Sequence, residues 1–393
     1  MASGPPVRVD RAAAAGSERP KRTILQIVAP GEIGGLESVV LALAAGQTRR
    51  GQRVTVAVVS EPREGEHPFA AALIEAGVAT VSFSVPARAY LKERALLKRL
   101  CEGVKPDVVH THGYRPDILH AGSRLRRRFA TVTTLHGSSK IGGRTTFHEL
   151  LQLFLLRRFD AVIAVSRELA ETLRGKRVPR DRLHLIPNAW SDRLPVADAF
   201  EARKFLGIPA DGMVVGWVGR LIPIKGADVL LEAARHLDDL PITISFVGDG
   251  SERARLEDLA RNAGLSDKVR FHGSVPDAAR YMRAFDVFVL SSRSEGTPIT
   301  LLEAIAAKVP VVATTVGGVP DVVGSAGAIL VPAQDPLRLA EAIRDVIKNR
   351  TSAAARADTA ANRLSTNYNI DRWLDAHDEV YQDAISHRIA RTL

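Results

Sequence analysis

Two glutamates, Glu295 and Glu303, stand eight positions apart in the stretch SRSEGTPITLLEA, residues 292–304. The preceding residues, DVFVLSS at 286–292, have the apolar, β-branched composition of a buried strand. We therefore expect Glu295 in the loop at the strand's end and Glu303 about one and a half turns into the next helix. Carboxylates so far apart cannot serve one atom, so we interpret them as hydrogen-bond acceptors for hydroxyl groups on either side of a diphosphate. Alternatively, they are an ordinary loop residue and an ordinary surface helix residue.

The residues between the two glutamates predict the start of that helix. Thr297 suits the N-cap, and Pro298 suits the first helical position, where a missing N–H costs nothing. The backbone N–H groups of Ile299, Thr300 and Leu301 would then be free. Together with the helix dipole, such amides favour an anion such as phosphate.

Two cations follow another predicted strand, in GWVGRLIPIKG at 216–226. Arg220 and Lys225 would lie at the same sheet edge as the helix start, where fixed positive charge can stabilise a diphosphate leaving group. The turn FVGDGSER at 246–253, which contains Gly248, opens a further helix at a strand end. Taken alone it could be only a tight turn, but together the three stretches predict a phosphate-binding cleft.

The elements that would position these residues alternate between strands and helices, which is typical of α/β folds with parallel sheets. We predict helices over 36–50, 88–102, 147–158 and most of 335–386, and thirteen strands. The strands cover 23–29, 54–60, 79–85, 107–112, 131–137, 160–166, 183–189, 213–219, 242–248, 269–275, 286–292, 309–315 and 328–333.

The alternation is interrupted at SDRLPVADAF, residues 191–200, which we interpret as a linker between two doubly wound domains. The predicted divisions are a flexible tail over 1–22, an N-terminal domain over 23–195 and a C-terminal domain over 196–369. A final helix over 370–393 contains Trp373 and Tyr381 and could return to the N-terminal domain.

Composition excludes several classes of protein. The single cysteine, Cys101, excludes an internal disulfide framework, and no apolar run reaches the roughly 18 residues of a transmembrane helix. The first 22 residues lack the apolar core of a signal peptide. Charge is uneven: residues 1–190 hold 30 Lys and Arg against 17 Asp and Glu, and residues 191–393 hold 24 against 27. Two domains with different partners would explain this, as would arginine-rich genome composition.

These motifs resemble those of the retaining nucleotide-sugar glycosyltransferases of family 4, which have the GT-B architecture of two Rossmann-like domains facing across a cleft. The resemblance is carried by GR…K at 219–225, VGDGSER, the F-x-G at 271–273 and SEGTPITLLEA, whose Glu-x7-Glu spacing is the most specific part. In the N-terminal half, PGEIGGLESVV, DVVHTHG, TLHG, VIAVS and IPN occur in the family's usual order. One departure is Ala189-Trp190 after IPN, where the family commonly has a glycine.

The resemblance implies a role for each matching residue. Arg220 and Lys225 would bind the diphosphate, Glu295 would contact hydroxyls of the donor sugar, and His136, in TLHG, would lie near the reacting carbon. A strand-end histidine without a catalytic role is the alternative for His136. Among the donor-binding residues, Glu303 would hold the ribose, Val275 would lie beside the base, and glycines 34 and 35 would let the loop approach the phosphate. The implied donor-binding set is Gly34, Gly35, Gly219, Gly248, Val275, Gly296, Thr297, Thr300, Leu301 and Glu303.

His110 and His112 alternate along one predicted strand and so face the same side. A metal site would need a third ligand, and no Asp or Glu neighbours them, so we favour an acceptor-cleft position. The chain contains no Asp-x-Asp pair of the kind that holds a divalent cation on a diphosphate. We therefore predict turnover without a metal or any other cofactor, with Arg220, Lys225 and the helix dipole taking the cation's place.

Basic clusters at 124–130 (RLRRRFA) and 91–100 (LKERALLKRL), and the apolar stretch FHELLQLFLLRRF at 147–159, suggest peripheral contact with an anionic membrane. The alternative is a buried helix with solvated flanks. Nucleic acid is not an expected partner, because only 5% of residues are aromatic and no recognised binding module appears.

The sequence thus predicts a retaining, metal-independent hexosyltransferase that uses a UDP- or GDP-sugar donor. The acceptor would be a lipid-linked, polysaccharide or glycolipid precursor of the cell envelope, and the enzyme would be cytoplasmic or peripheral on the inner membrane face. A sugar-nucleotide 2-epimerase and a non-catalytic nucleotide-sugar binding subunit are the alternatives.

Overall fold

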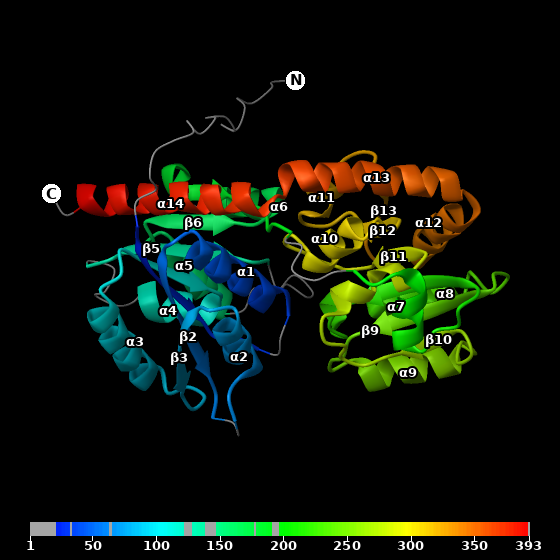
Figure 1. Cartoon of the computed structure of the whole chain (residues 1–393), viewed down its shortest axis with the longest axis horizontal. Helices are drawn as coiled ribbons and strands as arrows, with labels where there is room; N and C mark the ends of the chain where they lie inside the picture. Colours follow the sequence, from blue (N-terminus) through cyan, green and yellow to red (C-terminus); the bar gives the residue numbers. More distant parts are fainter. Residues whose placement is uncertain are drawn as a thin grey trace.

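The computed structural model describes residues 21–31, 34–62, 65–121, 128–137, 147–176, 178–190 and 196–391. Two parallel sheets lie side by side, each with helices on both faces (Figure 1). The N-terminal sheet has the strand order β3-β2-β1-β4-β5-β6-β7, and the C-terminal sheet has the order β10-β9-β8-β11-β12-β13. This confirms the predicted pair of doubly wound domains.

The N-terminal domain contains seven of the predicted strands, and the bounds of each differ from the prediction by at most a few residues. Its strands are β1 (Thr23–Val28), β2 (Arg53–Ser60), β3 (Ala79–Ser84), β4 (Val108–His112), β5 (Ala130–Leu135), β6 (Ala161–Ala164) and β7 (Leu183–Leu185). The helices between them are α1 (Gly35–Arg49), α2 (Pro68–Glu75), α3 (Tyr90–Val104), α4 (Tyr114–Ala121), α5 (Phe147–Leu156) and α6 (Arg167–Gly175).

The C-terminal domain contains the other six predicted strands. They are β8 (Met213–Val218), β9 (Ile242–Val247), β10 (Val269–Phe271), β11 (Val287–Leu290), β12 (Val311–Thr314) and β13 (Ile329–Val331). The helices are α7 (Ala199–Leu206), α8 (Ala227–Ala234), α9 (Arg253–Asn262), α10 (Ile299–Ala306), α11 (Val319–Val323), α12 (Pro336–Lys348) and α13 (Arg350–Asn367).

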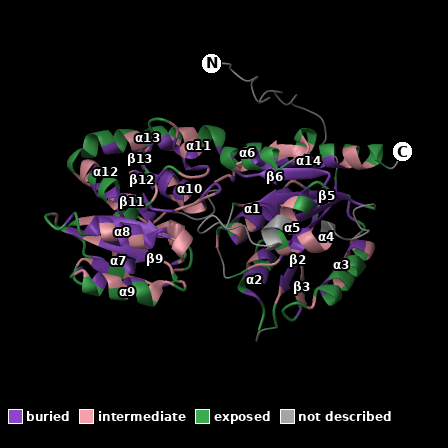
Figure 2. Cartoon of the chain, turned by 180° about the vertical axis from the view of Figure 1, so that it is seen from behind, coloured by how far each residue is buried: buried purple, intermediate pink, exposed green. Residues whose placement is uncertain are grey.

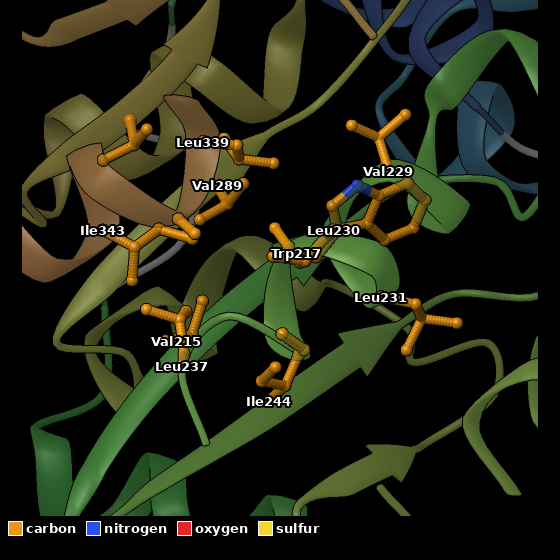
Figure 3. Packing of buried hydrophobic residues seen from close by; sticks show 14 of the residues in the cluster. Val215, Trp217, Val229, Leu230, Leu231, Leu237, Ile244, Val289, Leu339 and Ile343 are labelled. Carbon is orange, nitrogen blue, oxygen red and sulfur yellow. The ribbon is translucent and has the colours of Figure 1, made fainter. Parts of the chain in front are cut away.

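Burial explains why the strands were readable as apolar runs. Both faces of each sheet are covered by helices, so the central strands are almost wholly buried while the outer faces of the helices are exposed (Figure 2). The edge strands β3, β7 and β10 are only partly buried. In the C-terminal domain Trp217 of β8 packs among side chains of α8 and neighbouring strands (Figure 3). Its indole N–H donates to Ser291 Oγ at 3.2 Å, which ties β8 to the end of β11.

The strand order reverses beside β1 and beside β8, since β1 pairs with both β2 and β4 and β8 pairs with both β9 and β11. In open parallel sheets, ligands bind at the carboxyl ends of the strands at such a reversal. Each domain therefore has one such edge, and the loops after β1, β4, β8 and β11 must form the site.

The last helix, α14 (Ile370–Ala390), crosses back to the N-terminal domain, as predicted. It continues the line of α13 along one side of the molecule and packs over β4, β5 and β6 (Figure 1). Its side chains Trp373, Leu374 and Tyr381 are part of the N-terminal core. The Trp190 N–H donates to the carbonyl of Tyr368 at 3.0 Å, so the two chain crossings between the domains lie together. The predicted linker covers residues 191–200, of which 191–195 lie outside the described residues.

Candidate active site

Glu295 and Lys225 form an ion pair at the carboxyl edge of the C-terminal sheet. The Lys225 ammonium lies 2.7 Å from Glu295 Oε1 and 2.9 Å from Oε2. Ser292 Oγ donates to Glu295 Oε1 at 2.6 Å, and the Glu295 side chain is only 6% exposed. The carboxylate therefore holds the lysine at the point where β11 ends, with two donors already on it.

Arg220 lies on the neighbouring loop after β8 and differs from Lys225 in its partners. It is exposed, and no described residue pairs with it. Gly219 and Gly248 bring this loop against the one after β9: a Cβ at Gly248, whose φ is +135°, would lie 1.8 Å from the Gly219 carbonyl oxygen. Only glycine permits that contact.

A second ion pair, which the sequence analysis missed, anchors the turn that carries Lys225. The Arg293 guanidinium binds both oxygens of Asp228, at 2.9 and 2.7 Å, and also donates to the Pro223 carbonyl at 2.5 Å. The Arg293 backbone N–H donates to the Ile224 carbonyl at 2.8 Å. This pairing depresses the Asp228 pKa despite the carboxyl's partial burial. The only sequence signal was an arginine beside the Glu-x7-Glu motif.

The start of α10 corrects one prediction. The N-cap is Pro298 and the helix begins at Ile299, one residue later than expected, and Thr297 does not cap it. Thr297 Oγ1 instead donates to the Val165 carbonyl of the N-terminal domain. The first helical hydrogen bond runs from Leu302 to Pro298, so the amides of residues 299–301, including Thr300 and Leu301, remain free as predicted.

Glu303, one turn further along α10, contrasts with Glu295. It is partly buried, and no described residue donates a hydrogen bond to it. Burial raises its pKa to about 7. A carboxylate that is desolvated without donors suits a ligand that brings hydroxyl groups.

The N-terminal domain faces this site with the start of α1. Gly34 is the N-cap, and the buried Glu37 accepts hydrogen bonds from the backbone N–H groups of Gly31 and Gly34 at 3.1 and 2.9 Å. A Cβ at Gly35 would lie 3.9 Å from Ile299 Cγ1, so the amino ends of α1 and α10 lie next to each other. Two helix dipoles then point at one place.

The loops after β5 and β11 touch directly. A Cβ at Gly296 would lie 2.4 Å from the carbonyl oxygen of His136, and one at Gly137 would lie 3.3 Å from the Gly296 nitrogen. Asn188, in the IPN stretch, donates to the Thr297 carbonyl at 2.9 Å. His136 is thereby brought next to the segment that carries Glu295, while its contact with the donor sugar stays a prediction.

The structure does not support an acceptor-cleft position for His110. Its side chain is fully buried, and its ring nitrogens lie 2.8 Å from Tyr381 Oη and 2.8 Å from Thr134 Oγ1. It is a structural residue, because α14 covers the strand end that sequence reasoning left open. His112 shares its face as predicted, with ring centroids 4.1 Å apart, but is also buried and contacts His136.

Val275 lies in the loop after β10, partly buried against the C-terminal core. Its predicted contact with the base stays a prediction. The described residues contain no cluster of three or more His, Cys, Asp or Glu side chains suited to a metal ion. Nor does the described part of the chain include a helix with the length and hydropathy needed to cross a membrane.

Family models match both halves of the chain. Residues 198–367 match glycosyl transferases group 1, and residues 33–191 match Glycosyltransferase Family 4. The chain belongs to glycosyltransferase family 4.

Curated relatives of this family 4 chain include the 2-deoxystreptamine N-acetyl-D-glucosaminyltransferase of Streptomyces fradiae, which is 35% identical over 278 residues. That alignment covers 64% of this chain and 66% of the relative. A D-inositol 3-phosphate glycosyltransferase of Streptomyces scabiei is 29% identical over 90% of this chain and 87% of the relative. Alignments with the first four curated relatives cover between 47% and 66% of those proteins.

Among solved structures, the Anabaena protein HepE in complex with UDP-glucose has a TM-score of 0.82. It is 21% identical, and the alignment covers 93% of this chain and all of that one. At this identity the comparison establishes the fold that family 4 membership implies, the GT-B architecture.

Proposed function

We propose that this family 4 chain transfers a hexose-type sugar from a UDP- or GDP-sugar to a hydroxyl of a glycan or glycolipid acceptor, with retention of the anomeric configuration. The observation that carries the proposal is the pair of Lys225 and Glu295 beside the free amides of α10. A cation and helix amides suit the diphosphate, while a carboxylate at the same place suits sugar hydroxyls.

In the proposed reaction, the bond between the anomeric carbon and the diphosphate oxygen breaks as the acceptor oxygen bonds to the same face of that carbon. The acceptor's proton passes to the departing phosphate oxygen. Lys225, Arg220 and the α10 amides would stabilise the negative charge that develops on the diphosphate, a contribution of several kcal/mol in comparable sites. Closure of the two domains would exclude water, which otherwise competes as acceptor.

The donor is tested first by thermal shift. UDP, GDP and ADP, followed by their sugars, are added to the full chain, and one nucleotide is expected to raise the melting temperature. The name of the Streptomyces fradiae relative makes UDP-N-acetylglucosamine a sensible first sugar. No stabilisation by any nucleotide would refute the donor assignment.

Products then separate transfer from the alternatives. Mass spectrometry with a mixture of acceptors should show a glycosylated acceptor and free nucleoside diphosphate. Release of nucleotide or epimerised sugar with no acceptor product would favour a 2-epimerase. Binding without turnover would favour a non-catalytic subunit.

We also propose that turnover needs no metal, since Lys225, Arg220 and the α10 amides offer fixed positive charge where a divalent cation would otherwise act, and the sequence lacks an Asp-x-Asp pair. Activity is expected to be unchanged in EDTA. Loss of activity in EDTA with recovery in Mn²⁺ would contradict this.

A peripheral, cytoplasmic location on an anionic membrane is proposed for the same enzyme. It is supported by α3, which exposes Leu91 (84%) and Tyr90 (44%) beside basic residues such as Lys98. Of the other candidates, 124–127 lies outside the described residues. Residues 147–159 form a helix and turn with Leu155 and Leu156 buried, although Phe154 is 56% exposed. Sedimentation with anionic vesicles should show binding that weakens with salt; no salt-sensitive binding would refute it.

A further inference from the structure

Three imidazoles form a chain of neighbouring rings at the carboxyl ends of β4 and β5. The ring centroids of His110 and His112 are 4.1 Å apart, and those of His112 and His136 are 5.5 Å apart. His112 Nδ1 lies 3.2 Å from His136 Nε2. The other nitrogens of this pair, His112 Nε2 and His136 Nδ1, are buried with no hydrogen-bond partner among the described residues. Buried polar atoms seldom stay unpaired, so each needs an explanation.

His110 is excluded from that explanation because its surroundings fix its tautomer. Gln47 Nε2 donates to the Tyr381 oxygen at 3.1 Å, so the Tyr381 O–H is directed to His110 Nδ1 at 2.8 Å. His110 Nε2 then carries its hydrogen and donates to Thr134 Oγ1 at 2.8 Å. His110 is therefore held in one orientation, and the His112 ring packs against it at a tilt of 37°.

The His112–His136 pair has one hydrogen between its facing nitrogens. Burial lowers the pKa of His112 well below its usual range and that of His136 to about 3, so both rings are neutral at physiological pH. Either His112 Nδ1–H donates to His136 Nε2, or the reverse. In the first arrangement His136 Nδ1 carries the other hydrogen and is a donor; in the second it is an acceptor.

A substrate oxygen at His136 Nδ1 decides between the two. If His136 Nδ1–H donates to it, the atom left unpaired is the His112 Nε2 lone pair. If His136 Nδ1 accepts, the atom left unpaired is a buried His112 Nε2–H. Orphaned N–H groups are rarer in proteins than under-satisfied acceptors, which favours the first arrangement.

We propose that His112 is a positioning residue for sugar transfer: its Nδ1–H holds His136 Nε2, which fixes the ring plane of His136 and makes His136 Nδ1–H a donor to an oxygen of the donor sugar. This rests on the proposed function, in which His136 contacts the sugar. This role of His112 goes beyond packing. An aromatic ring without nitrogen could fill the space, but it would not select one tautomer of His136.

The test compares His112→Phe with His112→Asn in the full chain. Phenylalanine keeps the ring and removes the donor, while an Asn amide can replace the Nδ1 group. With the nucleotide sugar chosen by the melting-temperature screen, His112→Phe should lower kcat about tenfold, the effect of one hydrogen bond. His112→Asn should recover most of the loss. The affinity for the sugar-free nucleoside diphosphate, measured by calorimetry, should change less than twofold in both.

A matched control is His377→Phe, which removes another buried histidine of the same region, whose Nδ1 lies 2.8 Å from the Trp373 carbonyl oxygen. It should affect melting temperature but not kcat. Side-chain ¹⁵N NMR gives a readout without turnover: His136 should be in the Nδ1–H tautomer in the wild type and shift toward a mixture in His112→Phe.

Three results overturn the inference: full kcat in a folded His112→Phe variant, an equal loss in His112→Asn, or an Nε2–H tautomer of His136 in the wild type. His136→Ala separates this from failure of the proposed function. If His136→Ala transfers sugar normally, the proposed role of His136 is wrong. If His136→Ala is impaired and His112→Phe is not, only the positioning role is wrong.

Discussion

The two faces of the cleft are built from opposite kinds of polar group. The C-terminal domain contributes charge: Lys225 paired with Glu295, Arg293 paired with Asp228, and an exposed Arg220 that pairs with no described residue. The N-terminal domain contributes the neutral His112 and His136 and the amino end of α1.

This difference indicates that, in the proposed reaction, one domain binds the diphosphate and the other binds the sugar. Charge is placed where a diphosphate would leave, and it is held in position by carboxylates before any substrate binds. Such preorganised charge avoids reorganisation during the reaction. The opposite face can offer hydrogen bonds and shape to a neutral sugar without placing a competing cation near the anomeric carbon.

The largest expected effect comes from removing charge on the C-terminal face. Lys225→Ala should reduce kcat roughly 10²-fold or more at saturating donor, because the leaving diphosphate loses a cation that Glu295 holds in place. Steady-state rates measure this. Lys308→Ala, which removes an exposed lysine paired with Asp358, is the control and should be unaffected. A near-normal rate for Lys225→Ala would show that Lys225 does not stabilise the leaving diphosphate.

A smaller effect is expected from the pair behind that lysine. Arg293→Gln should loosen the turn at residues 223–225 and lower kcat roughly 10-fold while Lys225 itself remains. Asp228→Asn should lower kcat less, because Arg293 can still donate to the Pro223 carbonyl. The double variant should be no worse than Arg293→Gln, since Asp228 acts on the turn through Arg293. Arg235→Gln, on an exposed pair with Glu232, is the matched control. Additive losses would mean that the two residues act separately.

Glu303 should make donor binding depend on pH. With its pKa near 7, it is mostly ionised at pH 8 and mostly protonated at pH 6. The ionised form accepts hydroxyl hydrogens better, so the donor KM should rise up to about tenfold from pH 8 to pH 6. In Glu303→Gln this pH dependence should be absent. An unchanged pH profile would exclude Glu303 from donor binding.

The same group has an effect on stability with the opposite sign from most carboxyls. Its pKa in the folded protein lies above the ordinary value, so the folded state binds the proton more tightly and loses stability as pH rises from about 4.5 to 7. Glu303→Gln removes that loss, which is at most about 3 kcal/mol. The melting temperature of Glu303→Gln, relative to that of the wild type, should increase between pH 5 and pH 8.

The smallest effect concerns the structural part of the N-terminal face. Tyr381→Phe removes the hydroxyl that binds His110 and should lower the free energy of unfolding by about 1 kcal/mol. Sugar transfer should be unchanged, because His110 does not contact His136. Denaturant unfolding and kcat together check this, and a large kcat loss would mean that the histidines act as one unit.

Much of the fold could be predicted, because strands covered on both faces are continuous apolar runs. All thirteen predicted strands are present, but several end early: 269–275 was predicted and β10 is Val269–Phe271. Strand pairing stops where the chain turns into the cleft, and the apolar residues beyond, such as Val275, pack on the core instead. Periodicity cannot distinguish these two kinds of burial.

The site was less predictable wherever a contact joins distant parts of the chain. Thr297 has the composition of an N-cap, but a carbonyl of the other domain takes its hydroxyl. His110 was expected in a cleft because Tyr381, which covers it, lies 271 residues away in the sequence. The free amides of α10 were predictable because they depend only on where a helix begins.

Helix α14 has a consequence for how the protein is made. Trp373, Leu374 and Tyr381 complete the N-terminal core, yet the ribosome adds them after every strand of both domains. The C-terminal domain, whose core includes no described residue beyond Tyr368, can finish folding first, although domains generally fold in order from the amino end. Until residues 370–390 emerge, the N-terminal sheet would leave an apolar face uncovered, which makes this half of the nascent chain the part that a chaperone would bind.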